Sequence, residues 1–106
     1  MLSKFRTYQL SLELYREAKT VKLPHSLKDQ LLRAASSVCL NLAEGSAKPT
    51  EKDRAKFYAI AFGFCREVQS LIVMEAETLG KLHPIADRLG GSLYRLCRSR
   101  TLTGRP

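Results

Sequence analysis

The side chains in this sequence that could perform chemistry are few and widely spaced. Its three cysteines are Cys39, Cys65 and Cys97. Zinc sites usually contain ligands paired about two to four residues apart, a spacing that these cysteines lack. An odd number of distant cysteines also argues against a disulfide framework and favours a reducing compartment. We therefore expect thiols packed in the core, no metal site and a cytoplasmic location.

The two histidines do not complete a catalytic motif. Di-iron helix bundles use Glu-x-x-His pairs that point into the core. In this sequence Lys22 and Gly80 stand three residues before His25 and His83, so the motif is absent. We predict that the protein is not an enzyme and needs no cofactor.

Basic side chains give the clearest chemical signal. The 106 residues include 18 Lys and Arg against 10 Asp and Glu, a formal net charge of +8. In the last predicted helix and the tail, the candidate nucleic-acid-binding residues are Arg88, Tyr94, Arg95, Arg98 and Arg100. Guanidinium groups bind phosphates bidentately, and a tyrosine can stack on an unpaired base. The pattern favours binding to RNA or DNA, and a solvated helix face accounts for it equally well.

The elements that must position these residues are helices, because apolar residues recur at intervals of three and four and no strand-like alternation occurs. We expect one domain over residues 1–100 and a flexible basic tail over residues 101–106. The predicted helices are residues 4–21, 27–44, 51–79 and 84–99. Ser26 and Thr50 are the expected N-terminal caps, and Gly45 is the expected left-handed residue that ends the second helix. Gly90 and Gly91 could break the last helix.

Three of these helices carry more apolar surface than a single four-helix bundle needs. A surface helix of a monomer typically needs an apolar stripe about 100° wide, but the first and third helices each carry two. The residues predicted to form an oligomer interface are Leu10, Leu14, Tyr58 and Phe62. Exposed apolar patches of this kind mark interfaces, so we predict a homo-oligomer. Repetition of the arginine face around it would build a large positive field.

Polar residues recur at intervals of three or four along the second helix. Together with a glutamate of the third helix, they are predicted to form a structural polar network: Arg33, Ser37, Asn41, Glu44 and Glu75. A carboxylate near a helix C-terminus opposes the helix dipole, so Glu44 needs a partner. A pocket that combined Glu44, Glu75 and a tyrosine could be catalytic. Because no nucleophile or base accompanies them, we favour the structural interpretation.

The second helix carries a fairly specific motif. The string RAASSVCLNLAEG at residues 33–45, with FYAIAFG at residues 57–63 and Glu67, resembles the four-helix-bundle family of bacterial 23S rRNA intervening-sequence proteins. The sequence departs from the family pattern at Phe64, where a small serine is usual, and at Leu32, where a basic residue is frequent. The resemblance spans most of the chain up to about residue 80.

The resemblance implies an all-α, up-down four-helix bundle that assembles as a ring-shaped homopentamer. Relatedness to the accessory proteins of diversity-generating retroelements implies nucleic acid and a reverse transcriptase as partners. We therefore expect a protein that binds RNA or DNA through its arginine-rich face. The alternative is a scaffold that docks a protein partner, such as a reverse transcriptase or another nucleic-acid enzyme. No apolar run approaches the ~18–20 residues of a transmembrane helix, so no membrane partner is expected.

Overall fold

The structure is a computed structural model that describes residue 2 and residues 5–103, with side chains described as far as residue 98. Its helices are α1 (Arg6–Ala18), α2 (His25–Ser46), α3 (Glu51–Met74), α4 (Ala76–Leu79) and α5 (His83–Thr103), with a 3₁₀ turn, η2 (Gly80–Leu82), before α5. Within the described residues there is no strand.

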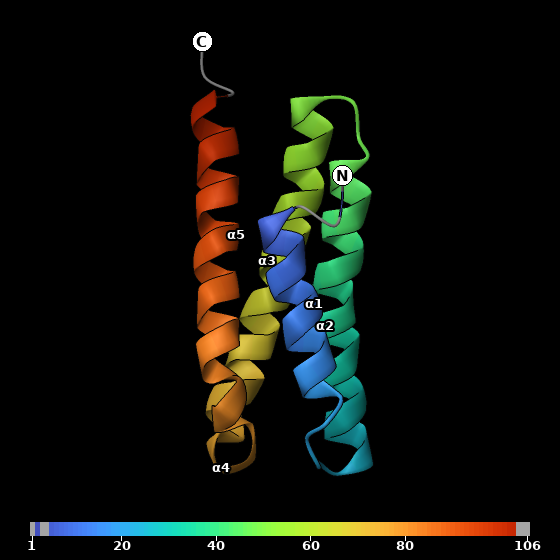
Figure 1. The fold of residues 1–106 in the computed structure, drawn as a ribbon, viewed down its shortest axis with the longest axis vertical. Coiled ribbons are helices and arrows are strands. Elements are labelled where there is room, and N and C mark those ends of the chain that lie inside the picture. The colour runs from blue at the N-terminus through green and yellow to red at the C-terminus, as the bar shows by residue number, and fades with distance from the viewer. Residues whose placement is uncertain (1, 3–4, 104–106) are drawn as a thin grey trace.

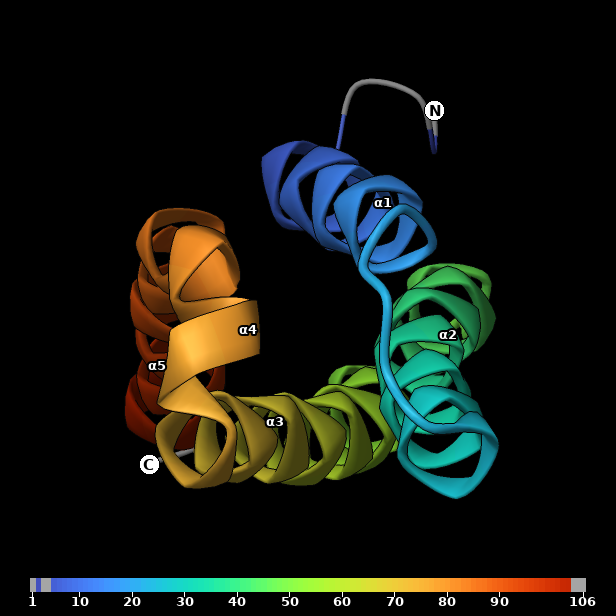
Figure 2. The same cartoon turned by 90° about the horizontal axis from the view of Figure 1, so that it is seen from below.

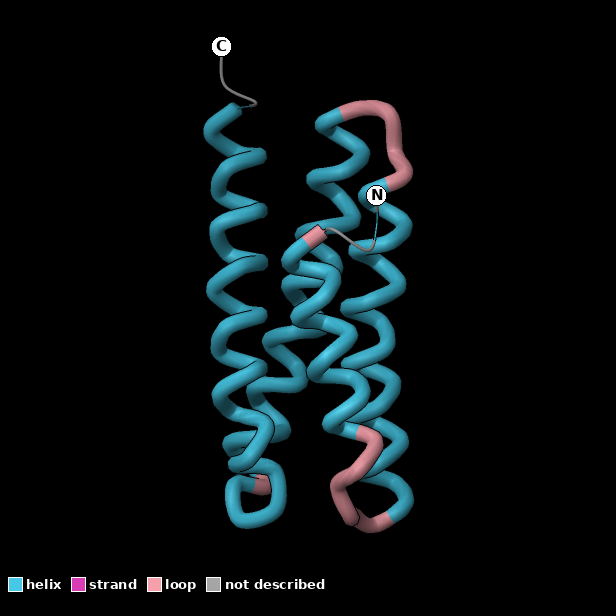
Figure 3. Tube along the Cα trace, in the orientation of Figure 1, coloured by secondary structure: helices cyan, strands magenta, loops and turns pink. Residues whose placement is uncertain are grey.

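The four long helices run alternately up and down along a molecule of 47 × 21 × 21 Å (Figure 1). An end view shows them arranged as a ring in chain order, with α1 beside α2, α2 beside α3, and α3 beside α5 (Figure 2). The loops that join α1 to α2 and α2 to α3 lie at opposite ends of the bundle (Figure 3). The predicted all-α four-helix bundle is therefore confirmed.

Leucines from α1, α2, α5 and the α4–η2 reversal fill the space inside this ring, and Cys65 and Val68 are the largest fully buried side chains from α3. The leucines with no more than traces of exposed surface are Leu14, Leu31, Leu42, Leu79, Leu82, Leu89 and Leu93. Removal of such side chains from water is the main favourable contribution to folding, at roughly 1.5–3 kcal/mol for each fully buried leucine. The core occupies the full length of the bundle, and it fixes the face that each helix turns to solvent.

Three of the four residues predicted to form an oligomer interface are buried in the core of the single chain. Leu10, Leu14 and Tyr58 are 3%, 0% and 2% exposed, so the prediction that they form an interface is wrong. Phe62 is half-buried, and its ring packs against the ring of Tyr94. The reason is that each helix of a four-membered ring has two neighbours, which bury two apolar stripes within one chain.

The end of α2 differs from the predicted one at a glycine. Gly45 does not end α2, has no positive φ angle and lies inside the helix. It is buried because α2 and α3 approach closely there: a Cβ atom on Gly45 would lie 2.9 Å from Phe57 Cβ and from the Tyr58 ring. The cap at Thr50 is confirmed, since Thr50 Oγ1 accepts a hydrogen bond from the Asp53 amide at 3.1 Å.

Other helix ends also differ from prediction, and α1 ends at Ala18 rather than at residue 21. The α2 helix begins at His25 after Pro24, with no side-chain cap, so the predicted Ser26 cap is wrong. The α3 helix ends at Met74, because Glu75 takes a non-helical conformation (φ −119°, ψ 46°). Thus α3 is about 36 Å long rather than about 43 Å, at ~1.5 Å per residue. The α5 helix continues to Thr103, which overlaps the tail expected from residue 101, and residues 104–106 lie outside the described residues.

The α5 helix passes through Gly90 and Gly91 without a break. Glycine in a helix interior costs only about 1 kcal/mol relative to alanine, which tertiary contacts offset here. Gly90 is buried beneath the side chain of Gln69 on α3, whose Nε2 would lie 2.5 Å from a Cβ atom at Gly90. Gly90 therefore permits a close approach between α3 and α5.

By length and hydropathy, α3 could cross a membrane. A helix of a bundle can have a similar composition, and α3 packs against both α2 and α5. One third (33%) of its apolar 18-residue stretch is buried within the bundle, and Ile60, Val73 and Met74 are exposed.

Candidate nucleic-acid interface

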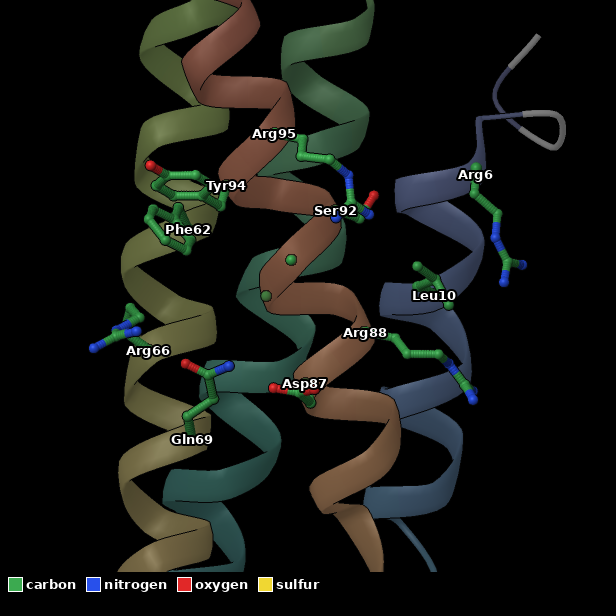
Figure 4. Close-up of a pocket in the computed structure, with 12 residues that line it drawn as sticks. Arg6, Leu10, Phe62, Arg66, Gln69, Asp87, Arg88, Ser92, Tyr94 and Arg95 are labelled. Carbon is green, nitrogen blue, oxygen red and sulfur yellow. The ribbon is translucent and has the colours of Figure 1, made fainter.

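A depression of about 550 Å³ lies over α5, between α1 and α3 (Figure 4). Four arginines from three helices line it: Arg6 of α1, Arg66 of α3, and Arg88 and Arg95 of α5. Asp87 is the one acidic residue among its lining residues, so their formal charge is 4 − 1 = +3. This is the site where the bundle gathers its arginines around a hollow.

The floor of the depression is formed by Gly90 and Gly91 of α5. Gly90 is covered by the Gln69 side chain, so the gap left by the missing side chains lies at Gly91. The guanidinium of Arg95 lies over this gap, since its Nη1 would be 3.4 Å from a Cβ atom on Gly91. The absence of a side chain at Gly91 thus creates the space that Arg95 reaches into.

Two polar contacts hold α1 against α5 at one edge of the depression. Thr7 Oγ1 and Ser92 Oγ share a hydrogen bond of 2.6 Å, and Thr7 is buried. Arg88 Nη2 lies 3.5 Å from Glu13 Oε2. These contacts place Arg6, the neighbour of Thr7, on the same edge as Arg88, as Figure 4 shows.

The arginines are poorly neutralised by the protein itself. Among the described residues, Arg6, Arg66 and Arg95 have no carboxylate oxygen within 4.0 Å. The Arg88–Glu13 pair is about half exposed on both sides, and such pairs contribute only about 0–1 kcal/mol. A phosphate can therefore compete with Glu13 for Arg88 at small cost.

An aromatic pair forms the opposite edge, next to α3. Tyr94 is 51% exposed, and its ring is tilted by 60° against that of Phe62 with centroids 6.4 Å apart. Tyr94 Oη accepts a hydrogen bond of 3.1 Å from Arg98 Nη1. Figure 4 shows both rings between α3 and α5, on the other side of α5 from Arg6 and Arg88.

The structure brings together three of the five predicted nucleic-acid-binding residues, Arg88, Tyr94 and Arg95. Arg98 adjoins them through its hydrogen bond to Tyr94. Arg100 lies in α5, but its side chain is outside the described part of the chain. Sequence reasoning missed the arginines of α1 and α3, although the closure of an up-down bundle, which places its first helix beside its last, could have indicated Arg6.

The predicted polar network on α2 is not continuous. Asn41 Nδ2 donates to the carbonyl oxygen of Ser37 at 2.8 Å, and Glu44 Oε2 lies 3.1 Å from Lys48 Nζ, just beyond the helix. Arg33 is exposed and makes no ion pair with another described residue. Short polar side chains on a helix reach the backbone of the preceding turn more readily than each other. The prediction of a network is therefore wrong.

Glu75 is separated from Glu44 by the length of the bundle. It lies at the break between α3 and α4, whereas Glu44 lies near the end of α2, and these two points are at opposite ends of the molecule (Figure 1). The break also removes Glu75 from the apolar seam of α3, and its side chain is half-buried. A catalytic pocket that combines these two glutamates is excluded.

The three cysteines have low reactivity because their thiols are buried or half-buried. Cys39 and Cys65 are buried and Cys97 is half-buried. Burial raises the pKa of the Cys65 thiol from 9.0 to about 11, and it also raises the pKa of the Cys39 and Cys97 thiols. All three are therefore neutral at physiological pH. Among the described residues, no group of three or more His, Cys, Asp or Glu side chains could hold a metal ion.

Residues 4–89 match the family model of the 23S rRNA-intervening sequence protein. This chain belongs to that family. No curated protein matches the chain. The match to the 23S rRNA-intervening sequence family covers α1 to α4 and the beginning of α5. It includes Arg6, Arg66 and Arg88, but ends before the glycine pair, Tyr94 and Arg95.

Proposed function

We propose that this member of the 23S rRNA-intervening sequence family is a non-catalytic protein that binds RNA or DNA through the depression over α5. The observation that carries this proposal is the convergence of Arg6, Arg66, Arg88 and Arg95 from three helices on one hollow. Guanidinium groups form strong bidentate hydrogen bonds with phosphate. Three of these four have no carboxylate partner among the described residues, which leaves them free to bind phosphates.

The dependence of binding on salt tests this proposal. Each neutralised phosphate releases counterions, with a slope of log K against log salt of about −0.7 per contact for a single strand. Three or four contacts give a slope of roughly −2 to −3. Filter binding of an RNA oligomer should show this slope, and no retention of RNA even at ~50 mM salt would contradict the proposal.

Substitution within the depression locates the binding surface. The double variant Arg88→Ala, Arg95→Ala should bind RNA at least about tenfold more weakly, because charge-assisted hydrogen bonds are worth roughly 1.5–3 kcal/mol each. Arg33→Ala is the matched control, since Arg33 is an exposed arginine on α2 that does not line the depression. Equal loss of affinity in the control variant would show that binding is not localised to α5.

We also propose that the chain assembles as a homo-oligomer, for which the family resemblance implies a ring of five. The support comes from exposed apolar side chains on α2 and α3, namely Leu40, Ile60, Val73 and Met74. Unlike the buried residues of the core, these are not covered within one chain. Assembly would repeat the arginine depression around the ring, and multivalency of this kind raises the affinity for a polyanion strongly.

The second candidate function is a scaffold that docks a protein such as a reverse transcriptase or another nucleic-acid enzyme. The same exposed apolar side chains on α2 and α3 favour it, because a protein partner would cover them. Charge reversal at Arg88 and Arg95 distinguishes the two functions. If the protein binds nucleic acid, this charge reversal abolishes binding of RNA. If the protein is a scaffold, the charge reversal leaves capture of the protein partner through α2 and α3 intact.

A further inference from the structure

We infer that the depression over α5 holds one unpaired nucleotide of an RNA strand, with its phosphate among the arginines and its base on the Tyr94–Phe62 pair. The inference rests on the proposed nucleic-acid binding and specifies the form of the ligand. The depression of about 550 Å³ falls within the ~300–1,000 Å³ of small-ligand pockets. It is therefore large enough for a single nucleotide.

The two edges of the depression differ in chemistry in the way that the two ends of a nucleotide differ. Arg6 and Arg88 lie at the α1 edge, and Arg95 extends from α5 toward the middle of the depression (Figure 4). Tyr94 and Phe62 lie at the α3 edge, where Arg66 is the one lining arginine beside them (Figure 4). A nucleotide likewise carries its charge at the phosphate and its aromatic surface at the base. Laid across the glycine pair, it would meet guanidinium groups at one end and aromatic rings at the other.

The aromatic edge is preorganised for stacking. One side of the Tyr94 ring packs against Phe62, its hydroxyl accepts a hydrogen bond from Arg98, and half of the residue is open to solvent. A ring that is already held in position loses little conformational freedom when a base stacks on it. Stacking on such a ring tolerates any base, because every base has a π face.

Asp87 restricts where the phosphate can lie. It lines the depression two helical turns before Arg95, about 12 Å along α5. Among the described residues it has no cation within 4.0 Å to neutralise it, so it repels a phosphate at that end. The phosphate is therefore directed away from Asp87, toward the two arginines that lie nearer the other end of the depression, Arg6 and Arg95 (Figure 4).

A duplex can use only part of this site. Paired bases are stacked inside the helix, and their faces cannot reach Tyr94. A duplex would contact the arginines through its phosphates and gain nothing from the aromatic edge. The prediction is a preference for single-stranded over duplex RNA that depends on Tyr94, in addition to a salt-dependent affinity that depends on the arginines.

The test compares an unstructured RNA of about 12 nucleotides, a length suited to ssRNA-binding sites, with the same sequence annealed to its complement. Wild type should bind the single strand more tightly. Tyr94→Ala should weaken single-strand binding by roughly 5- to 100-fold, the range found for removal of one base–aromatic stack, and leave duplex binding unchanged. Tyr94→Phe keeps the ring and should retain single-strand binding. Far-ultraviolet circular dichroism and the melting temperature of each variant exclude unfolding as the cause.

The outcomes separate this inference from the proposed function. If duplex RNA binds as tightly as the single strand and Tyr94→Ala changes neither, the inference is overturned while arginine-dependent binding stands. If neither form of RNA binds to wild type, both are overturned. Photo-cross-linking of a 4-thiouridine-substituted strand provides a second measurement. Adducts on the peptides that contain Tyr94 or Phe62 support the inference, and adducts confined to α2 overturn it.

Discussion

Gly45 of α2 lies so close to Phe57 of α3 that a Cβ atom on the glycine would be 2.9 Å from Phe57 Cβ. The Tyr58 ring lies at the same distance from that position. Neither neighbour is the free end of a flexible side chain, so the two helices themselves would have to separate to admit a methyl group. This contact fixes the distance between α2 and α3, and it explains a glycine that the sequence pattern places at the end of a helix.

Gly45→Ala is therefore expected to destabilise the protein, despite the higher helix propensity of alanine. Overpacking typically costs about 1–3 kcal/mol, and denaturant unfolding would measure the change. Gly80→Ala is the control, because Gly80 has right-handed helical angles and no atom within 4 Å of an added Cβ. That variant should be more stable by about 0.4–1 kcal/mol. Equal effects of the two substitutions would show that the close approach at Gly45 is unimportant.

The arginines of α1 and α3 should contribute to RNA binding although they lie far from α5 in sequence. Arg6→Ala or Arg66→Ala should lower the affinity several-fold and make the salt slope shallower by about 0.7 for each phosphate that is no longer neutralised. Fluorescence anisotropy across a salt series measures both quantities. If both variants show the same salt dependence of RNA affinity as wild type, the interface is confined to α5.

Cys65 makes stability depend on pH in the alkaline range. Its pKa is raised by burial from 9.0 to about 11 in the folded protein, so the folded state keeps a proton that the unfolded state releases above pH 9. The free energy of unfolding should thus fall as pH rises from about 9 to about 11, by an amount on the order of 2 kcal/mol. Below pH 9 this contribution is fully present.

The measurement for Cys65 is the difference in unfolding free energy between wild type and Cys65→Ala over this pH range. The two proteins share all their other ionisable side chains, so the contributions of those side chains cancel in the difference. The difference should shrink as pH rises, because the variant lacks the thiol. A constant difference between pH 8 and pH 11 would mean that the Cys65 thiol has an ordinary pKa.

The exposed apolar side chains of α2 and α3 should control assembly. The double variant Leu40→Glu, Ile60→Glu places charges on a surface that is already open in the single chain, so the fold should be preserved. Light scattering should find an oligomer for wild type and a species near 11.9 kDa for the variant. A wild-type mass of 11.9 kDa would instead show that these side chains are simply solvated.

The fold could be predicted from sequence to the level of helix number and order, because the spacing of apolar residues at three and four is set by the geometry of each helix alone. Sequence patterns were insufficient where two helices meet. Gly45 and Gly90 permit close approaches between helices rather than turns, and Gly91 leaves room for the Arg95 side chain of its own helix. Similarly, the apolar stripes that contain Leu10 and Tyr58 predict an interface between subunits. The sequence pattern shows that each helix has two apolar stripes, but it does not show that two neighbouring helices of the same chain cover both stripes.

The candidate site was predictable in part for the same reason. The arginines and the tyrosine of α5 lie on one helix, so their common face follows from helical periodicity. Arg6 and Arg66 reach the depression only because α1 and α3 flank α5 in the ring, and the hydrogen bond between Thr7 and Ser92 that holds α1 there joins residues far apart in the sequence.

The decisive experiment for the depression over α5 is to titrate one single-stranded RNA with wild type, with the Arg88→Ala, Arg95→Ala variant and with Arg33→Ala across a salt series. We expect tight binding by wild type and by Arg33→Ala with a log–log slope of roughly −2 to −3, and a weaker, shallower dependence for the double variant. Coincident binding curves for all three proteins, or no binding by any of them at low salt, would contradict the assignment of this depression as a nucleic-acid interface.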